Sequence, residues 1–477
     1  MYYLKLFDKT LITFDMKFDM ELNISNIKQI EKNKEIFPII LQKQINEQTI
    51  EKFITSRIIP KNRAFVKNIL ESAGLNMNNK KGIIDISKGL SLIDSYWIVE
   101  DDNLKFADYN LFDNDFSEIL SLVAFTGYSS KIDKLVSSPE LTTNGALKKC
   151  WRRIKKQVYL YKGGNYRDEY VNIGNEPYNE YYASQVAKKM GIDCIEYGLD
   201  KWKGTLASTC KLFTSKNKSY IQIGDLMEKS SIVEAYNICK IYGFEKKFAD
   251  MILFDSIIIN EDRHFGNFGL LRDNKTGKFI DFAPIFDNGA SLMYFENRQS
   301  LKLKDQYEKI KNSNNFVVSY YGIEFDRLVA TYCYKEQIDK LRNLLTFNFE
   351  KHPKYNLSDT SLKILSNMIQ DRARHFIDVL EHSERYIKTE TEIKQEKSEE
   401  ILEIDKVKYE NYDFDKSYYK FLYIEYDESI KENKYHAILI EDNSGIVEEE
   451  FLTERCAKKF LNNEYFNVEE LHKEDEI

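Results

Sequence analysis

An acidic and an amide side chain stand five positions apart in the polar segment that follows a long apolar run. From one tight loop, Asp262 and Asn267 can point into the same cleft, and Gly266 allows the backbone turn that this requires. A second carboxylate, Asp287, follows another apolar run and precedes Asn288 and a glycine. Mg²⁺ prefers such oxygen ligands when phosphates supply the others. The spacing therefore indicates chemistry on a nucleoside triphosphate.

Two further charged residues stand upstream of this segment. Lys162 ends a stretch of alternating residues, and Glu180 follows Asn175 and Pro177 at the start of a helical pattern. A lysine can hold phosphates as a point charge, but its flexible side chain must be positioned. Glu180 could do this through an ion pair, while Asp262 accepts or orients the proton of an attacking hydroxyl. The order Lys, Glu, Asp, Asn, Asp is typical of protein-kinase-like enzymes.

The elements that must position these residues can be predicted from periodicity. Residues 158–162 alternate as a strand does, and Gly163-Gly164 ends it. Tyr178 to Met190 continues at helical spacing after the Asn175 start signal. Phe248 to Ile259 is apolar on all sides, which predicts a buried helix leading into the Asp262 loop. Leu362 to Leu380 predicts a long amphipathic helix.

With these motifs in view, residues from about 120 to 385 resemble a HipA-like serine/threonine kinase domain. The resemblance rests on Asp262-Arg-His-Phe-Gly-Asn267, on the Asp287-Asn-Gly segment, on Leu160-Tyr-Lys-Gly-Gly164 and on Asn179-Glu180. Residues 138–149 resemble the phosphate-binding loop of that family. The chain has no Gly-x-Gly-x-x-Gly pattern, so this loop depends mainly on Gly145.

The resemblance implies a kinase that uses ATP and Mg²⁺ to phosphorylate a serine or threonine of a protein substrate. Carried over by position, it implies a catalytic Asp262, a phosphate-contacting Lys162 braced by Glu180, cofactor contacts from Thr143, Gly145 and Lys149, and metal ligands Asn267 and Asp287. It also implies regulatory autophosphorylation at Thr142 or Thr143, where added negative charge would repel bound phosphates.

The expected fold class is α+β, with a two-lobed protein-kinase-like fold at its centre. Residues 1–120 predict an N-terminal α+β accessory region, which begins with a hairpin and includes a helix over Asn62–Leu70. The kinase domain spans 121–385, with a small lobe over 121–215 and a large lobe over 216–385. The rest is then predicted as a charged linker over 386–410 and a small ββα module over 411–477, whose two strands are Tyr418–Tyr426 and Tyr435–Ile440 and whose helix is Thr453–Leu461.

Composition excludes several other classes of protein. The chain has 477 residues, 43% of them hydrophobic, a net charge of −8, and only 19 glycines and 6 prolines. These values argue against wholly disordered, collagen-like and nucleic-acid-coating proteins. No apolar run is long enough for a membrane span, and the six scattered cysteines predict reduced core thiols. We therefore expect a cytoplasmic protein with no membrane partner.

Three alternatives remain open at this stage. The nine residues Lys148–Lys156 carry six cations. This stretch could bind nucleic acid with Trp151 stacking on a base, be a solvated strand edge, or lie beside the triphosphate of a kinase. The protein could bind nucleotide without transferring phosphate. It could also be a lipid kinase, since phosphoinositide kinases share the Asp-Arg-His order. His264 could act as a general base, but in a phosphoryl-transfer loop it is expected to brace the loop by hydrogen bonding.

Overall fold

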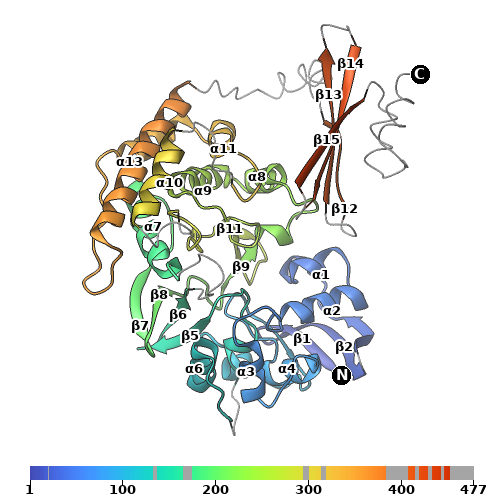
Figure 1. The fold of residues 1–477 in the computed structure, drawn as a ribbon. Coiled ribbons are helices and arrows are strands. Elements are labelled where there is room, and N and C mark those ends of the chain that lie inside the picture. Colours follow the sequence, from blue (N-terminus) through green and yellow to red (C-terminus); the bar gives the residue numbers. More distant parts are fainter. Residues whose placement is uncertain are drawn as a thin grey trace. The chain divides into compact units, whose positions relative to one another are not determined.

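The computed structural model divides into two compact units, Met1–Ser383 and Glu384–Ile477. In the first unit it describes residues 1–19, 21–132, 137–164, 174–293, 300–312 and 319–382. In the second it describes four strands, and each unit is treated separately below (Figure 1). The described chain is mixed α and β with four sheets.

The N-terminal region is an antiparallel sheet with helices packed against it (Figure 1). Its strand order is β3-β2-β1-β4, with β1 Tyr2–Leu6, β2 Lys9–Asp19, β3 Glu21–Gln29 and β4 Tyr96–Val99. The helical segments are η1 Lys34–Ile36, α1 Ile39–Lys43, α2 Glu47–Ser56, α3 Val66–Ser72, α4 Lys80–Ser87, α5 Phe106–Tyr109, α6 Glu118–Thr126 and η2 Pro139–Leu141.

A second antiparallel sheet follows, with the order β5-β6-β8-β7. Its strands are β5 Lys149–Ile154, β6 Gln157–Gly163, β7 Gly198–Trp202 and β8 Thr205–Lys211. Helix α7, Glu176–Met190, lies between β6 and β7 in the chain and packs on β8, on β6 and on β7. The sheet therefore brings the end of β6 against the beginning of α7.

The remainder of the first unit is mostly helical around a small sheet of order β11-β10-β9. Its strands are β9 Lys218–Gln222, β10 Gly269–Asp273 and β11 Phe279–Phe282. Its helical segments are η3 Ile223–Asp225, α8 Ile232–Ile241, α9 Glu245–Ile258, α10 Ser300–Asn312, α11 Phe325–Tyr332, η4 Lys335–Gln337, α12 Ile338–Arg342 and α13 Asp359–His382.

Two large hydrophobic cores hold these parts together. One surrounds the apolar helix α9 and includes residues of α7, α8, α11 and α13. The other belongs to the N-terminal sheet and continues into the second sheet through Cys150, Tyr161 and Ala207. The N-terminal region therefore shares its core with the sheet that carries Lys162.

The second unit contains a four-stranded antiparallel sheet of order β12-β13-β14-β15. Its strands are β12 Val407–Asp413, β13 Tyr418–Asp427, β14 Glu432–Glu441 and β15 Gly445–Phe451. The two predicted strands correspond to β13 and β14, whereas β12 and β15 were not predicted. The predicted helix Thr453–Leu461 lies outside the described residues.

Most predicted elements of the first unit are present, with one clear difference. The hairpin at the N-terminus, the strand with Lys162, and helices α7, α9 and α13 occur where the periodicity places them. The helix predicted over Asn62–Leu70 instead begins at Val66, because Phe65 has a left-handed φ of 58°. The N–H of Ala64, just before it, donates to Ala146 O at 2.8 Å, far along the chain.

Two further expectations were that the chain has no membrane span and that its cysteines are reduced. Over the part that the structure describes, no helix combines the length and apolar character needed to cross a membrane. The five described cysteines are free thiols, and three of them, Cys150, Cys239 and Cys333, are buried.

Candidate active site

Three of the predicted side chains meet at the end of β6. Lys162 Nζ lies 3.0 Å from Glu180 Oε1 of α7, and it also contacts the carboxylate of Asp287, which follows β11. Glu180 is fully buried and Lys162 is nearly so. Since both residues are cut off from solvent, the lysine has few alternatives to these carboxylates. The contact joins β6, α7 and the loop after β11.

The charges of this cluster stabilise one another. Burial lowers the pKa of Lys162, but Asp287 and Glu180 outweigh it and hold that pKa above its ordinary value. Burial raises the pKa of the Asp287 carboxyl, but Lys162 and Lys149 lower it further, to about 2. Glu180 also accepts the Asn288 N–H through Oε2 at 3.0 Å. Glu180 therefore braces both the lysine and the backbone beside Asp287.

The backbone at Asp287 is in a conformation that non-glycine residues rarely adopt. Its φ is 57°, in the left-handed region, and its N–H donates to the Tyr197 hydroxyl at 3.2 Å. Such a conformation costs of order 1–3 kcal/mol and persists where the surroundings enforce it, which is common at functional sites. Here it turns the carboxylate toward Lys162.

The Asp262 loop begins where α9 ends. Asn260 Oδ1 accepts the Asp262 N–H at 3.2 Å, and Asn267 Nδ2 donates to Asp262 O at 3.0 Å. Asp262 is exposed, whereas Asn267 is buried. His264 Nδ1 accepts the Gly266 N–H at 3.0 Å, so His264 braces the loop as predicted. Asp262 can thus meet a substrate from outside.

A residue whose role the sequence did not reveal, Arg263, ties this loop to the Asp287 segment. Its guanidinium makes two bonds to the buried carboxylate of Asp255 in α9, at 2.8 and 2.9 Å. It donates to Asn267 O at 3.1 Å, to Phe286 O, and to Asn288 Oδ1 at 2.6 Å. One buried cation therefore holds the carbonyl of Asn267 and the residues on both sides of Asp287. The sequence did carry one signal for this contact. Asp255 lies in the apolar helix α9, where a buried carboxylate needs a cationic partner.

The predicted phosphate loop lies between η2 and β5. Gly145 has a φ of +93°, and a Cβ there would lie 2.2 Å from Lys149 Nζ. Lys149 Nζ instead donates to Asn144 O at 2.8 Å. Lys149 is the cross-strand partner of Lys162. Burial, with Lys162 nearby, lowers the pKa of Lys149 to about 7. The loop, Lys149 and Lys162 are therefore brought together.

The two threonines of this loop differ in accessibility. The Thr142 hydroxyl donates to Leu90 O at 2.8 Å, and the residue is buried. The Thr143 hydroxyl donates to Pro139 O at 2.6 Å and accepts the Trp151 indole N–H at 2.9 Å. Thr143 is only half-buried. Of the two predicted modification sites, Thr143 is the more accessible.

A second residue that sequence reasoning missed, Arg63, holds the two ends of the phosphate loop. It comes from the N-terminal region and pairs with Glu140; both side chains are fully buried. It donates to Thr143 O at 2.9 Å and to Lys149 O at 3.0 Å. The loop geometry thus depends on a segment about eighty residues upstream, a distance over which the sequence carries no periodic signal.

The donors present suit Mg²⁺ better than a transition metal. Among the described residues no group of three or more His, Cys, Asp or Glu side chains could hold a metal by itself. Asp287 offers a carboxylate, and Asn267 offers an amide oxygen because its nitrogen already bonds Asp262 O. Mg²⁺ usually takes one or two protein oxygens and completes its shell with phosphates and water. Asn267 and Asp287 fit that pattern.

Comparison with known families finds a match for the part of the chain that contains the site. Residues 141–345 match the family described as the HipA-like C-terminal domain. The resemblance to HipA-like kinases that the motifs predicted is therefore confirmed, and all of the predicted site residues lie within the matched segment.

The individual proteins and structures that resemble this chain share low sequence identity with it. The chain is 29% identical over 140 residues to the serine/threonine-protein kinase CtkA of Helicobacter pylori, and the match spans 26% of this chain and 42% of that protein. The crystal structure of the proinflammatory kinase CtkA has a TM-score of 0.40 at 19% identity, covering 49% of this chain and 92% of that one. A Shewanella oneidensis complex of HipA, HipB and operator DNA has a TM-score of 0.49 at 11% identity, covering 82% and 100%.

Proposed function

We propose that this protein is an ATP- and Mg²⁺-dependent kinase that phosphorylates a serine or threonine of a protein. The observation that carries the proposal is the convergence of Lys162, Glu180 and Asp287, which stand far apart in the sequence. Low-identity similarity to a serine/threonine-protein kinase and the HipA-like family match support a kinase-like activity. The cytoplasm, with its ATP and reduced thiols, is the proposed compartment.

In this proposal the chain positions the phosphates and the acceptor hydroxyl. Lys162, held by Glu180, contacts the phosphates, and the loop at Thr143, Gly145 and Lys149 covers them. Mg²⁺ held by Asn267 and Asp287 would neutralise charge on the transferring group. Asp262, exposed at its loop, orients the substrate hydroxyl and receives its proton.

We place the phosphate loop, Lys162 and Glu180 in a small lobe over 121–215. Asp262, Asn267 and Asp287 then belong to a large lobe over 216–385. Regions 1–120 and 411–477 are accessory to this domain, and 386–410 connects the last of them. Closing the two lobes around ATP would also exclude water from the transfer.

The direct test is transfer of radiolabelled γ-phosphate from ATP, with protein and phosphoinositide acceptors offered in parallel. We expect labelled protein, and a loss of about 3 kcal/mol or more of transition-state stabilisation, about a hundredfold in rate, in Asp262→Asn and in Asp287→Asn. Unchanged labelling in both variants would refute the assignment. ATP binding without labelling would indicate a nucleotide-binding regulatory protein, and labelled lipid a lipid kinase.

Autophosphorylation is part of the proposal, with Thr143 favoured over Thr142 because its hydroxyl is less enclosed. A phosphate there would carry about −1.5 to −2 charges and would displace the Trp151 indole. We expect one added phosphate by intact mass after incubation with Mg-ATP, absent in Thr143→Val and retained in Thr142→Val. An unmodified wild-type mass would exclude it.

A further inference from the structure

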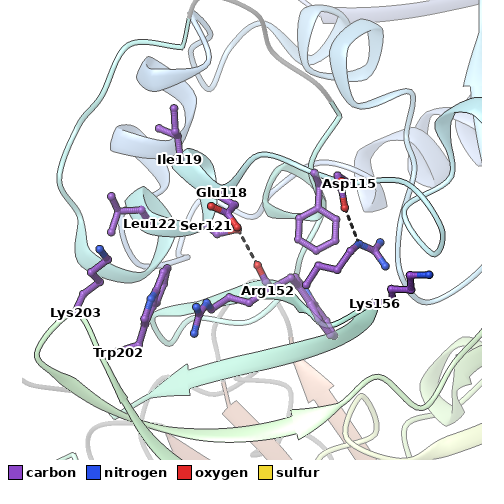
Figure 2. A pocket seen from close by; sticks show the side chains of 12 residues that line it. Asp115, Glu118, Ile119, Ser121, Leu122, Arg152, Lys156, Trp202 and Lys203 are labelled. Atoms are coloured by element: carbon purple, nitrogen blue, oxygen red, sulfur yellow. Dashed lines mark hydrogen bonds and ion pairs between the residues drawn. The ribbon is translucent and has the colours of Figure 1, made fainter.

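A cavity of about 700 Å³ is lined by residues of α6 and of both edge strands of the second sheet, β5 and β7. Its walls come from α6, from β5 and from the turns of the β5–β6 and β7–β8 hairpins (Figure 2). None of the predicted site residues lines it. It contains part of the cationic stretch Lys148–Lys156, which the proposed kinase activity leaves without a role.

Two adjacent arginines of β5 behave differently in this cavity. Arg153 pairs with Asp115 at 3.3 Å and donates to Leu111 O at 2.9 Å and Asn114 O at 2.7 Å. Arg152 makes no ion pair with a carboxylate within the described residues. Its guanidinium lies 4.4 Å from the ring centre of Trp202 and 4.7 Å from that of Tyr161. Arg152 is thus held between aromatic rings and not by a carboxylate of the described residues.

Lysines occupy unusual backbone positions on both sides of Arg152. Lys155 and Lys156 have φ values of 49° and 68° in the β5–β6 turn, and Lys203 has a φ of 50° in the β7–β8 turn. Tight hairpin turns favour Asn or Gly at such positions, because a side chain there costs about 1 kcal/mol or more. In Figure 2, Lys203 stands beside Trp202, while Lys156 lies on the other side of Arg152. Two of these lysines, Lys156 and Lys203, line the cavity and add positive charge to that of Arg152.

We propose that this cavity binds a small anion carrying a planar ring, of the nucleoside monophosphate type. The guanidinium of Arg152, 4.4 Å from the ring centre of Trp202, places a cation beside aromatic rings, and a planar ring can stack on such a group. Ile119 and Leu122 of α6 supply apolar contact, and Ile119 is 43% exposed. The cavity has the size of a small-molecule site, and its charged lining, listed here in full, favours an anion: Arg152, Arg153, Lys156 and Lys203 against Asp115 and Glu118.

The cavity is also connected to the phosphate loop. Trp151, which lines it, receives a hydrogen bond at its carbonyl from Ser121 Oγ of α6 at 2.7 Å. The indole N–H of Trp151 donates to the Thr143 hydroxyl, and the backbone N–H of Trp151 donates to Glu140 Oε1 at 2.7 Å. A ligand that moves β5 against α6 therefore changes contacts of the loop. This coupling rests on the proposed function, whereas the binding does not.

The binding is measured by tryptophan fluorescence, because two of the three tryptophans line the cavity and Trp97 is buried elsewhere. In the Trp151→Phe chain, Trp202 is the tryptophan next to the ligand and lies outside the Lys162 cluster. We expect AMP to quench its emission saturably. Adenosine or inorganic phosphate alone should bind at least about tenfold more weakly, since each supplies half of the contacts.

Three variants made in the Trp151→Phe chain decide the location. Arg152→Gln should raise the Kd for AMP at least about tenfold. Lys201→Gln, which removes an exposed lysine of the β7–β8 hairpin that does not line the cavity, should leave the Kd unchanged. Lys162→Met should abolish phosphate transfer and leave the quenching intact, so failure of the proposed function does not affect this measurement. An unchanged Kd in Arg152→Gln overturns the site. Quenching only by an oligonucleotide, with steep dependence on salt, would overturn it in favour of nucleic acid.

The coupling is measured by the KM for ATP with and without AMP. The wild type, Arg152→Gln with Trp151 intact, and Trp151→Phe are compared. Any competition by AMP at the Lys162 cluster is common to all variants, so the difference between them reports the cavity. We expect the AMP effect to be larger in the wild type than in Arg152→Gln or in Trp151→Phe. Equal effects in all three would overturn the coupling.

Discussion

Two buried arginines hold the two loops that flank Lys162, and they do so in the same way. Arg263 and Arg63 are each 2% exposed, each pairs with a buried carboxylate, and each donates to backbone carbonyls of a loop. They differ in where their partners come from. Asp255 stands eight positions before Arg263, whereas Glu140 is 77 positions after Arg63.

Because of this difference, the two loops of the site depend on different parts of the chain. The Asp262 loop and the Asp287 segment are held by a residue inside the family-matched segment 141–345. The phosphate loop is held by Arg63, which lies outside that segment. The phosphate loop therefore depends on the N-terminal region for its structure. We expect changes in that region to affect nucleotide binding more than the chemical step.

The largest effect is expected from Arg263→Lys. A lysine cannot reproduce the fork that bonds Asp255, Asn267 O and Phe286 O together, so both metal-ligand segments should shift. We expect the rate of the chemical step to fall about a hundredfold or more in single-turnover phosphate transfer.

Arg272→Lys is the matched control for this variant. Arg272 is equally buried and donates to Phe37 O at 3.0 Å, but it does not contact either loop of the site. Both variants should lower the free energy of unfolding, since each disturbs a buried guanidinium. Equal loss of single-turnover rate in both would mean that general destabilisation, not loop geometry, is being measured.

A smaller and different effect is expected from Arg63→Lys. Losing the bonds to Thr143 O and Lys149 O should loosen the phosphate loop and raise the KM for ATP about tenfold, with kcat changed by less than about threefold. Arg57→Lys is the control, because Arg57 forms a buried pair with Asp94 in the same region without touching the loop. If the two variants shift the KM alike, the comparison between the two arginines fails.

The same comparison explains what the sequence could predict. Lys162, Glu180 and Asp287 could be found because their types, order and local periodicity are properties of short segments. The contacts of Arg63 could not, because they join positions 77 to 86 apart and a folded core must bring them together. The start of α3 was also misplaced, since Phe65 takes a left-handed φ where the chain before it bonds Ala146 O through the Ala64 N–H.

The C-terminal sheet shows another limit of periodicity. Strands β13 and β14 are central and rich in Tyr, Ile and Leu, so their sequences predict strands. Strands β12 and β15 form the edges, and their sequences carry many charged residues, including Glu448–Glu450. Charges are common on edge strands because they oppose further pairing, and they also hide the apolar alternation.

A moderate effect is expected from Gly145→Ala, which tests the loop without changing a charge. The new Cβ would lie 2.2 Å from Lys149 Nζ and must displace it. We expect the KM for ATP to rise about fivefold. Gly191→Ala is the control, because that glycine also has a positive φ, +69°, but has nothing within 4 Å of an added Cβ. Both variants should destabilise folding by about 1 kcal/mol, and an equal KM in both would show that the Lys149 contact does not matter.

The smallest effect is expected from pH alone. Burial, together with Lys162, brings the pKa of Lys149 to about 7, so Lys149 loses its proton as pH rises above 7. ATP should bind the protonated form more tightly, and the KM for ATP should rise about threefold between pH 7 and 9. Asp287, with a pKa of about 2, does not titrate in this window.

Folding stability should respond to this group in the opposite direction. The unfolded chain keeps the Lys149 proton up to its ordinary pKa of about 10.4, so between pH 7 and that value it binds more protons than the folded chain, and the contribution of Lys149 to stability rises with pH. Steady-state KM and urea unfolding at pH 7, 8 and 9 check both signs. Lys149→Arg, which stays charged, should remove both slopes, and slopes that persist in that variant would assign the titration to another group.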